Sequence, residues 1–333
     1  MNVGIIYRKK PDMVLEVSEK DIARIQEAMP NDNVSFFRTY QELYDKGFKA
    51  DILVGGHPGW NSNEGEITFD EYCDWAKTVR WNHVLFTGVE DVVDSPMLKK
   101  YNIILTNSGG VMAMPIADHI MTFILCYVRC IPEALSYQSK RIWKRPPTVD
   151  ETCDKTLGVI GMGKIGTVLA ARAKAFNMNV IGYKRTFEEI PNVDKLYTDS
   201  EGLDKLLSES DFVVLLLPYT KDTDKFIDSE KLAKMKRTAY FINNGRGDCV
   251  DDDALIHALR NGIIAGAALD AQSSEPFDPD SPLWGMENVI ITAHYGGDSR
   301  RTFERGFTLF LENLPLFLSG KQLINTIDLD KKY

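Results

Sequence analysis

LGVIGMGKIG, at residues 157–166 of this 333-residue chain, is its most informative sequence motif. The run beginning at Leu157 is short and apolar, like a buried strand, and TVLAARAKAF after Gly166 has the spacing of an amphipathic helix. A strand, a glycine-rich turn and a helix in this order are typical of dinucleotide-binding folds. In such a turn Gly161 permits the bend, Gly163 lets the backbone approach a pyrophosphate, and the helix N-terminus attracts the anion. We therefore predict a dinucleotide site that includes Gly161, Met162, Gly163, Lys164, Ile165 and Gly166.

The end of the next predicted strand indicates which dinucleotide is bound. An NAD-binding fold usually places an acid there, which accepts hydrogen bonds from the adenosine ribose. This chain instead has Lys184, 21 residues after Gly163, followed by Arg185 and Thr186. Two cations and a hydroxyl can hold a 2′-phosphate through charge-assisted hydrogen bonds. The prediction is that NADPH or NADP is preferred and NADH or NAD is possible; the alternative is a solvated basic turn.

Outward from this motif, short β-branched runs alternate with amphipathic stretches, a pattern that predicts parallel sheets. A first series of strand candidates is VGIIY, NVSFF, DILVGG and HVLF, between Val3 and Phe86. A second series begins with IILT at Ile103 and continues through LGVIG, NVIGY, DFVVLLL, AYFIN, AGAALD and NVIIT. The series predict two doubly wound α/β units. A helix over residues 300–318 follows the last strand and can cross back to the first unit, which makes that unit discontinuous.

The predicted architecture is thus a Rossmann cofactor domain inserted into a flavodoxin-like substrate domain. The substrate domain comprises residues 1–102 and 298–333, and the dinucleotide-binding domain residues 103–297. Ser18 and Asp251 are predicted helix N-caps, and Gly262 a helix terminus. The apolar helix at residues 115–131 must be buried on most sides. Its pattern does not distinguish burial within its own subunit from burial at a subunit interface.

Composition narrows the functional classes. The length corresponds to about two domains, and 44% hydrophobic residues suffice for a core in each. The formal charge of −9 opposes binding to nucleic acid. The longest apolar stretches, such as IMTFILCYV, are shorter than the roughly 20 residues that span a bilayer. With an opening, MNVGIIY, that does not resemble a secretion signal, these features predict a cytoplasmic protein that does not bind membranes.

Cysteine usage leads to a related expectation. The five cysteines are widely spaced, with no pair at metal-binding spacing: Cys73, Cys126, Cys130, Cys153 and Cys249. Free thiols in a reducing compartment are the favoured interpretation, and no metal site is expected.

Three polar segments follow predicted strands of the second series. They read NNGRGD at residues 243–248, LDAQSSEP at residues 269–276 and TAHYGG at residues 292–297. Parallel sheets bind ligands at the C-terminal ends of their strands, so these segments are expected to meet there. An isolated Arg246 is more often a surface residue, and an isolated His294 a structural one. Their order after a dinucleotide loop favours a catalytic site.

These motifs resemble those of the D-isomer-specific 2-hydroxyacid dehydrogenases, over nearly the whole chain. The resemblance rests on GMGKIG, NNGRGDCVDDDAL, AALDAQSSEPFDPDSPLWGMENVIITAH and the earlier TNSGGVMAMPIADH. It implies that Arg246 binds substrate, that His294 is the acid/base and that Glu275 is its carboxylate partner. Two departures, Ala293 where the family often has proline and Glu90 where its turn usually has aspartate, leave the substrate open.

The resemblance also implies further ligands. Asp270 corresponds to the residue that holds the nicotinamide carboxamide, and the amides of Thr87 and Gly88 to a turn that binds the substrate carboxylate. A homodimer through the cofactor domain is expected. The remaining expected cofactor ligands are Pro218, Thr223, Asn244, Gly245, His294 and Gly296.

The chemistry of these side chains agrees with that assignment. Arg246 offers a planar cationic fork for a carboxylate and a carbonyl oxygen, and a protonated His294 beside Glu275 can donate a proton to a developing alkoxide. We expect NAD(P)H-dependent reduction of a 2-oxoacid to a D-2-hydroxyacid. A corepressor-like dinucleotide sensor and a phosphite-type oxidoreductase are the alternatives.

Trp60 either stacks on an aromatic substrate or covers the hinge, and the roles of His57 and Trp143 stay open.

Overall fold

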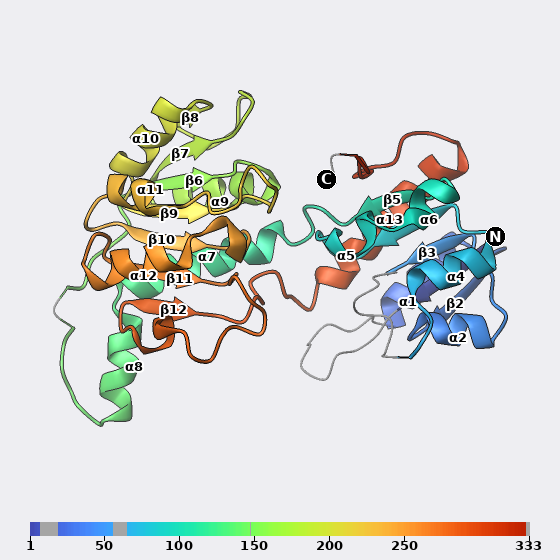
Figure 1. Cartoon of the computed structure of the whole chain (residues 1–333), viewed down its shortest axis with the longest axis horizontal. Helices are drawn as coiled ribbons and strands as arrows, with labels where there is room; N and C mark the ends of the chain where they lie inside the picture. Colours follow the sequence, from blue (N-terminus) through green and yellow to red (C-terminus); the bar gives the residue numbers. More distant parts are fainter. Residues whose placement is uncertain (7–18, 56–64, 147, 331–333) are drawn as a thin grey trace. The chain divides into compact units, whose positions relative to one another are not determined.

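The protein consists of two α/β units (Figure 1), here in a computed structural model that describes residues 1–6, 19–55, 65–146 and 148–330. One unit comprises Met1–Met112 and Asp298–Tyr333, and the other Ala113–Gly297. The predicted division at residues 102 and 103 therefore lies ten residues too early, whereas the second division falls at the predicted position. His57, Trp60 and Ser18 lie outside the described residues.

The first unit is built on a parallel sheet of five strands in the order β2-β1-β3-β4-β5. This order is the flavodoxin-like one and confirms the predicted fold of this unit. Residues 103–112 belong here because β5 pairs with β4, with Ile104 opposite Trp81. The strands are β1 (Asn2–Ile6), β2 (Asn33–Phe37), β3 (Ile52–Val54), β4 (Trp81–Val84) and β5 (Ile104–Asn107).

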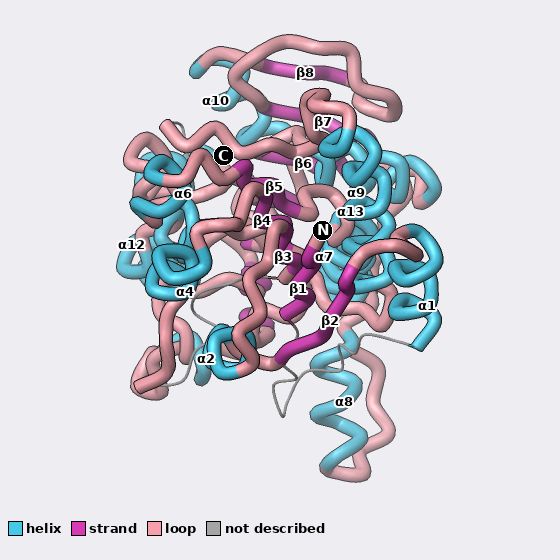
Figure 2. The backbone as a smooth tube through the Cα atoms, turned by 90° about the vertical axis from the view of Figure 1, so that its right-hand side faces the viewer, coloured by secondary structure: helices cyan, strands magenta, loops and turns pink. Residues whose placement is uncertain are grey.

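Helices cover both faces of this sheet, as Figure 2 shows: α2, α4 and α6 lie on one side, and α1 on the other with the returning α13. The unit therefore has two hydrophobic cores, one on each face of the sheet. Tyr40 and Tyr72 belong to one core, and Phe303 and Phe307 belong to the other. The helices are α1 (Glu19–Ala28), α2 (Tyr40–Asp45), α4 (Phe69–Ala76), α5 (Glu90–Val93), α6 (Pro96–Lys100) and α13 (Thr302–Leu318).

The second unit contains a parallel sheet of seven strands in the order β12-β11-β10-β9-β6-β7-β8. Numbered within the unit, this is the Rossmann order with one added strand, as predicted. Strand β8 was not predicted, because Lys-Leu-Tyr is short and lacks a β-branched run. The strands are β6 (Thr156–Ile160), β7 (Asn179–Tyr183), β8 (Lys195–Tyr197), β9 (Phe212–Leu215), β10 (Tyr240–Asn243), β11 (Gly266–Leu269) and β12 (Val289–Ile291).

Side-chain caps begin three helices of this unit. Asp199, Asp228 and Asp251 each accept a hydrogen bond from a backbone amide of the first turn. The predicted cap at Asp251 is thus confirmed, and Gly262 follows that helix with a φ of +61°. The helices are α7 (Ala113–Val128), α8 (Ile131–Ser139), α9 (Lys164–Ala175), α10 (Ser200–Glu209), α11 (Ser229–Lys234) and α12 (Asp252–Arg260), with short 3-10 helices η1 (Gly247–Cys249) and η2 (Pro282–Gly285).

The predicted apolar helix corresponds to α7, and it is buried largely within its own unit. Ile120, Phe123 and Ile124 join the core that α9 and the sheet form. By contrast, α8 buries none of its residues and projects away from the sheet with the chain that follows it (Figure 1). No single helix of the described chain is long and apolar enough to cross a membrane; only α7 and α8 together, bent by 66°, meet that criterion on length and composition.

A buried histidine links strands of the first unit. His83 on β4 is fully buried, and its Nδ1 lies 2.8 Å from Oγ1 of Thr106 on β5. The Thr106 hydroxyl also accepts a hydrogen bond from the Trp81 indole at 2.8 Å. Burial lowers the pKa of His83 to about 4, although a backbone hydrogen bond at Gly306 opposes this shift. The imidazole is therefore neutral in the folded unit at neutral pH.

This burial predicts an acid-sensitive first unit. An unfolded histidine takes up its proton near pH 6.5, whereas the folded His83 does so only near pH 4. Stability is thus complete above pH 6.5 and declines as the pH falls to 4, by roughly 3 kcal/mol at about 1.4 kcal/mol per pKa unit. Denaturant unfolding across this range should show a smaller decline for His83→Gln than for wild type. The same substitution at the exposed His257 should leave the decline intact; equal declines in both variants would contradict the account.

Candidate functional site

The glycine loop joins β6 to α9. Gly161 has a φ of +106°, a left-handed conformation that favours glycine. Gly163 is the N-cap of α9 and forms no side-chain cap, unlike the three aspartate-capped helices. A Cβ placed on Gly163 meets no atom within 4 Å, so open space lies above the loop, whereas one on Gly166 would lie 3.1 Å from the Gly161 carbonyl oxygen. Uncapped amides beneath open space fit a pyrophosphate.

The predicted 2′-phosphate ligands follow the neighbouring strand β7. Lys184 is partly buried, and Arg185 and Thr186 are exposed. The backbone amides of Gly161 and Met162 both donate to the Tyr183 carbonyl, at 2.9 and 3.2 Å, which holds the glycine loop against the end of β7. Lys184 itself forms an ion pair with Glu188. Charge and position are thus compatible with an adenosine ribose phosphate.

On the other side of β6, a short loop follows β9. The Thr223 hydroxyl donates to the Pro218 carbonyl at 2.7 Å and accepts from the Thr220 amide at 2.7 Å. Pro218 and Thr223, both predicted cofactor ligands, therefore belong to one hydrogen-bonded turn. This turn lies at the C-terminal end of a strand that pairs with β6.

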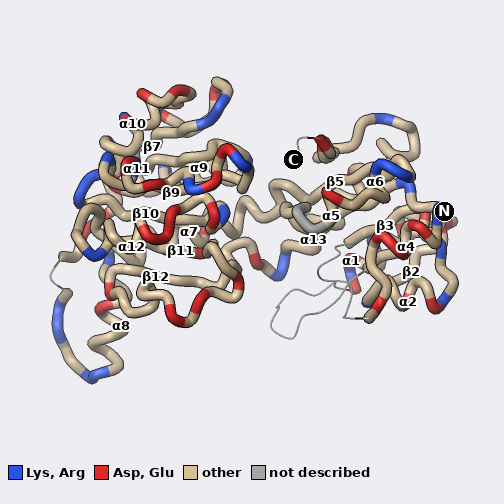
Figure 3. Tube along the Cα trace, in the orientation of Figure 1, with Lys and Arg blue, Asp and Glu red and all other residues tan. Residues whose placement is uncertain are grey.

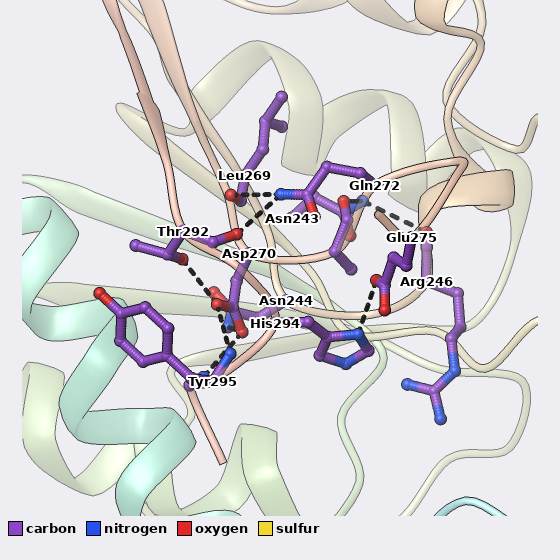
Figure 4. A network of polar contacts seen from close by, with 12 residues as sticks. Asn243, Asn244, Arg246, Leu269, Asp270, Gln272, Glu275, Thr292, His294 and Tyr295 are labelled. Atoms are coloured by element: carbon purple, nitrogen blue, oxygen red, sulfur yellow. Dashed lines mark hydrogen bonds and ion pairs between the residues drawn. The ribbon is translucent and has the colours of Figure 1, made fainter. Parts of the chain in front are cut away.

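Asp270, at the end of β11, is the centre of a buried polar cluster (Figure 4). Its carboxylate accepts hydrogen bonds from the Thr292 hydroxyl at 2.6 Å, the Asn244 amide group at 3.0 Å and the Gly296 backbone amide at 3.0 Å. Nε2 of His119 lies 3.4 Å away. Burial alone raises the pKa of Asp270, but the hydrogen bonds from His119, Thr292 and Gly296 outweigh it and hold this pKa below its ordinary value. Asp270 is therefore a fixed negative charge.

Asn244 provides a buried acceptor inside the same cluster. Its side-chain amide group donates to Asp270, while its Oδ1 is buried and has no hydrogen-bond partner among the described residues. An unsatisfied buried acceptor costs free energy, so it indicates a missing donor. A nicotinamide carboxamide is a donor of the right kind. Together with the open glycine loop, this atom shows that the residues present fit a nicotinamide dinucleotide.

Glu275 and His294 form a pair at the ends of β11 and β12. Nδ1 of His294 lies 2.7 Å from Oε1 of Glu275, and both side chains are partly exposed. His294 has a left-handed φ of 52°, unusual for a residue with a side chain. Because Glu275 occupies Nδ1, Nε2 is the nitrogen left to exchange a proton with a ligand. This is the geometry of an oriented general acid/base.

Arg246 follows β10 and lies beside this pair in Figure 4, with its guanidinium directed away from the Asp270 cluster. Its Nη1 donates to the Gly245 carbonyl at 2.9 Å, and its own carbonyl accepts from Asn243 at 3.2 Å. Gly247 fixes the next turn, because a Cβ there would lie 1.9 Å from the backbone of Gln272. The arginine loop and the Glu275 loop are thus held together by backbone contact.

Thr87 and Gly88 lie in the first unit, directly after β4 and residues 85–86. Asn107 donates to the Thr87 carbonyl at 2.6 Å and so fixes the turn. Within the described chain, the amides of Thr87 and Gly88 donate to no protein acceptor. Their assignment to the substrate carboxylate stays a prediction.

Sequence reasoning missed the positioning residues of the Asp270 cluster. His119 contacts Thr292 at 3.1 Å and packs its ring against Phe123 and Tyr295. It lies on α7, more than a hundred residues before these strand ends, and the sequence signal that could have identified it is its place as the last residue of the motif TNSGGVMAMPIADH. No group of three or more His, Cys, Asp or Glu side chains in the described ranges is arranged to hold a metal ion, and all five cysteines are free.

Comparison with known proteins gives consistent matches. The family model described as "D-isomer specific 2-hydroxyacid dehydrogenase, NAD binding domain" matches residues 121–296. A glyoxylate reductase of Korarchaeum cryptofilum is 38% identical over 240 residues, which cover 69% of this chain and 71% of that protein. Glyoxylate/hydroxypyruvate reductase B of Escherichia fergusonii is 31% identical over 324 residues, 95% of this chain and 94% of the relative.

Solved structures agree over the full length. An NADPH-dependent glyoxylate/hydroxypyruvate reductase from Sinorhizobium meliloti, in complex with NADP and sulfate, has a TM-score of 0.77 and 25% identity, with 100% of each chain covered. A D-isomer specific 2-hydroxyacid dehydrogenase from Xanthobacter autotrophicus, in complex with NADPH and MES, has a TM-score of 0.79 and 25% identity, covering 100% of this chain and 99% of that one.

Proposed function

The chain belongs to the D-isomer-specific 2-hydroxyacid dehydrogenase family, and on this basis we propose that it reduces a 2-oxoacid to the D-2-hydroxyacid, with NADPH as the preferred cofactor. The observation that carries the proposal is the 2.7 Å contact between His294 and Glu275, which lies beside Arg246. These residues and the glycine loop follow strands of the same sheet.

The residues that hold the cofactor surround the C-terminal strand ends. The glycine loop holds the pyrophosphate, Lys184 and Arg185 the 2′-phosphate, and Asn244 with the Asp270 cluster the carboxamide. When bound, NADPH supplies the hydride for the carbonyl carbon of the substrate. The full set is Gly161, Met162, Gly163, Lys164, Ile165, Gly166, Lys184, Arg185, Thr186, Pro218, Thr223, Asn244, Gly245, Asp270, His294 and Gly296.

Proton transfer is the work of the chain's own side chains. Arg246 holds the substrate carboxylate and polarises the carbonyl oxygen. His294, protonated, donates from Nε2 to the oxygen as negative charge develops there. Glu275 orients the ring through its contact with Nδ1. In the reverse direction His294 accepts the proton from the hydroxyacid.

Steady-state kinetics test this proposal. We expect NADPH oxidation with at least one of glyoxylate, hydroxypyruvate, pyruvate, a branched 2-oxoacid and phenylpyruvate. Binding of NADPH without oxidation by any of them would favour a dinucleotide sensor. Reduction of NADP by phosphite would favour the non-carbon oxidoreductase instead.

Cofactor preference gives a prediction for Lys184 and Arg185. A charge-assisted hydrogen bond to the 2′-phosphate is worth roughly 1.5–3 kcal/mol, which corresponds to about tenfold or more in kcat/KM. The double variant Lys184→Asp and Arg185→Ala should invert the preference, since it removes attraction and adds repulsion. Wild-type kcat/KM for NADH equal to or above that for NADPH at low ionic strength would refute the preference, because salt screening is then weakest.

We also propose a homodimer. Its subunit interface is formed not by α7 but by α8 and the segment that follows it. Because α7 is buried within its own unit, its apolar face is not free for a partner. A group of exposed apolar side chains instead lies on and after α8, where Figure 3 also shows a group of basic residues. They are Ile131, Leu135, Ile142, Trp143 and Val149. A projecting apolar segment of this kind is typical of an interface.

Sedimentation tests the dimer. We expect a species of about twice 37.6 kDa at micromolar concentration. Leu135→Ser combined with Trp143→Ser should shift it toward the monomer, because both side chains are exposed in the isolated chain. Phe187→Ser, a substitution of another exposed aromatic residue distant from α8 in sequence, should not. A wild-type monomer under these conditions would rule the dimer out.

A further inference from the structure

Lys184 already has an acidic partner in its own loop. Its Nζ forms an ion pair with Oε1 of Glu188. The Lys184 side chain is 23% exposed and that of Glu188 is 59% exposed. Both residues lie between β7 and β8 in chain without helical structure, so the four-residue spacing does not bring them together as it would on a helix. The loop folds back so that this acid reaches the cation at the end of β7.

We propose that Glu188 sets the strength of cofactor selectivity by competing with the 2′-phosphate of NADPH for Lys184; this inference rests on the proposed function. A lysine ammonium is a compact point charge, and a carboxylate and a phosphate are alternative anions for it. Binding the phosphate must release Glu188 and bring a second anion close to it, which is unfavourable. NADH has a hydroxyl at this position and leaves the ion pair intact.

A second role for the same carboxylate has the opposite consequence. Glu188 could accept hydrogen bonds from the ribose hydroxyls of NADH, in place of the acid that this family of folds usually has at the strand end. The ion pair favours competition, because Oε1 of Glu188 already binds the cation that the 2′-phosphate would need. The two roles predict different effects on cofactor affinity when the Glu188 charge is removed. Competition predicts tighter NADPH binding, whereas hydrogen bonding to the ribose predicts weaker NADH binding.

Isothermal titration calorimetry of the purified 333-residue protein distinguishes these two roles of Glu188. The titrants are NADP, NAD and adenosine 2′,5′-bisphosphate, at low ionic strength and without substrate. Glu188→Gln should bind NADP and the bisphosphate roughly twofold to fivefold more tightly, the range that corresponds to the free energy of an exposed ion pair. NAD affinity should not change. The matched control is Glu189→Gln, which removes the same charge at the neighbouring position. The Glu189 side chain is exposed and forms no ion pair within the described residues.

Two outcomes overturn the competition: unchanged NADP affinity in Glu188→Gln, or weaker NAD binding. A double-mutant cycle tests the route through Lys184, because the gain should become smaller when Glu188→Gln is made in a Lys184→Ala background, where only the relief of repulsion between Glu188 and the phosphate is left. A gain of full size in that background also overturns it. Failure of the proposed preference looks different: wild type then binds NAD as tightly as NADP, yet Glu188→Gln still gains affinity for NADP.

Discussion

His294→Ala is expected to lose about 10²–10⁴-fold in kcat, the contribution that a positioned general acid usually makes. The reason is local: with Nδ1 bound to Glu275 at 2.7 Å, Nε2 is the group poised to protonate the substrate oxygen. Alanine removes this donor, and the Asp270 cluster, which we propose holds the nicotinamide end, is held by Thr292, Asn244 and Gly296 and not by the His294 imidazole. The dissociation constant of NADPH, measured by fluorescence, should therefore change little.

The control for this variant is His257→Ala, because His257 is exposed on α12 and away from the strand ends. It should keep wild-type kcat. Turnover by His294→Ala near the wild-type rate would remove His294 from the mechanism, and a parallel loss of NADPH binding would show that the substitution had damaged the cofactor site instead.

Arg246→Lys should lower kcat/KM for the 2-oxoacid by about 10²–10³-fold, the usual cost of losing one preorganised donor at a developing oxyanion. Lysine keeps the charge but cannot hold a carboxylate and polarise a carbonyl with one planar fork. The backbone of this loop is fixed independently of the side chain, because Asn243 bonds to the Arg246 carbonyl and Gly247 packs on Gln272. The loss should thus come from chemistry rather than from unfolding.

Initial-rate kinetics with Arg246→Lys and Arg260→Lys check this prediction. Arg260 ends α12 and is exposed, so its variant should behave as wild type. Thermal unfolding of both variants should match wild type. If kcat and KM of Arg246→Lys both stay close to wild-type values, Arg246 is not the substrate anchor.

The sequence predicted those features that depend on local patterns. The strand, the glycine turn and the start of the helix are contiguous at residues 157–166. Arg246, Asp270 and His294 each come within three residues of the end of an apolar strand, so their positions at strand ends could be inferred. Parallel pairing then brings β10, β11 and β12 side by side. The predicted pairing of Glu275 with His294 came from family resemblance, since the two residues are 19 positions apart, with η2 and β12 between them, and this separation does not fix their distance in space.

Features that depend on tertiary contacts could not be predicted. Residues 103–106 look like any second-series strand, and only pairing with β4 assigns them to the first unit. The burial of α7 and the exposure of Trp143 depend on what packs nearby. His119 and Glu188 gain their roles from tertiary contacts. His119 ends the motif TNSGGVMAMPIADH, which by itself does not indicate its partner, and Glu188 lies in none of the quoted motifs.

The most direct test of the central claim is a product analysis with NADPH that carries deuterium on the transferable C4 position. It uses the 2-oxoacid from the panel that the enzyme turns over fastest. The account predicts deuterium at C2 of the product, detected by mass spectrometry, and the D configuration, determined by chiral chromatography. A product without the label, a product of L configuration, or no product from any 2-oxoacid despite bound NADPH would contradict it.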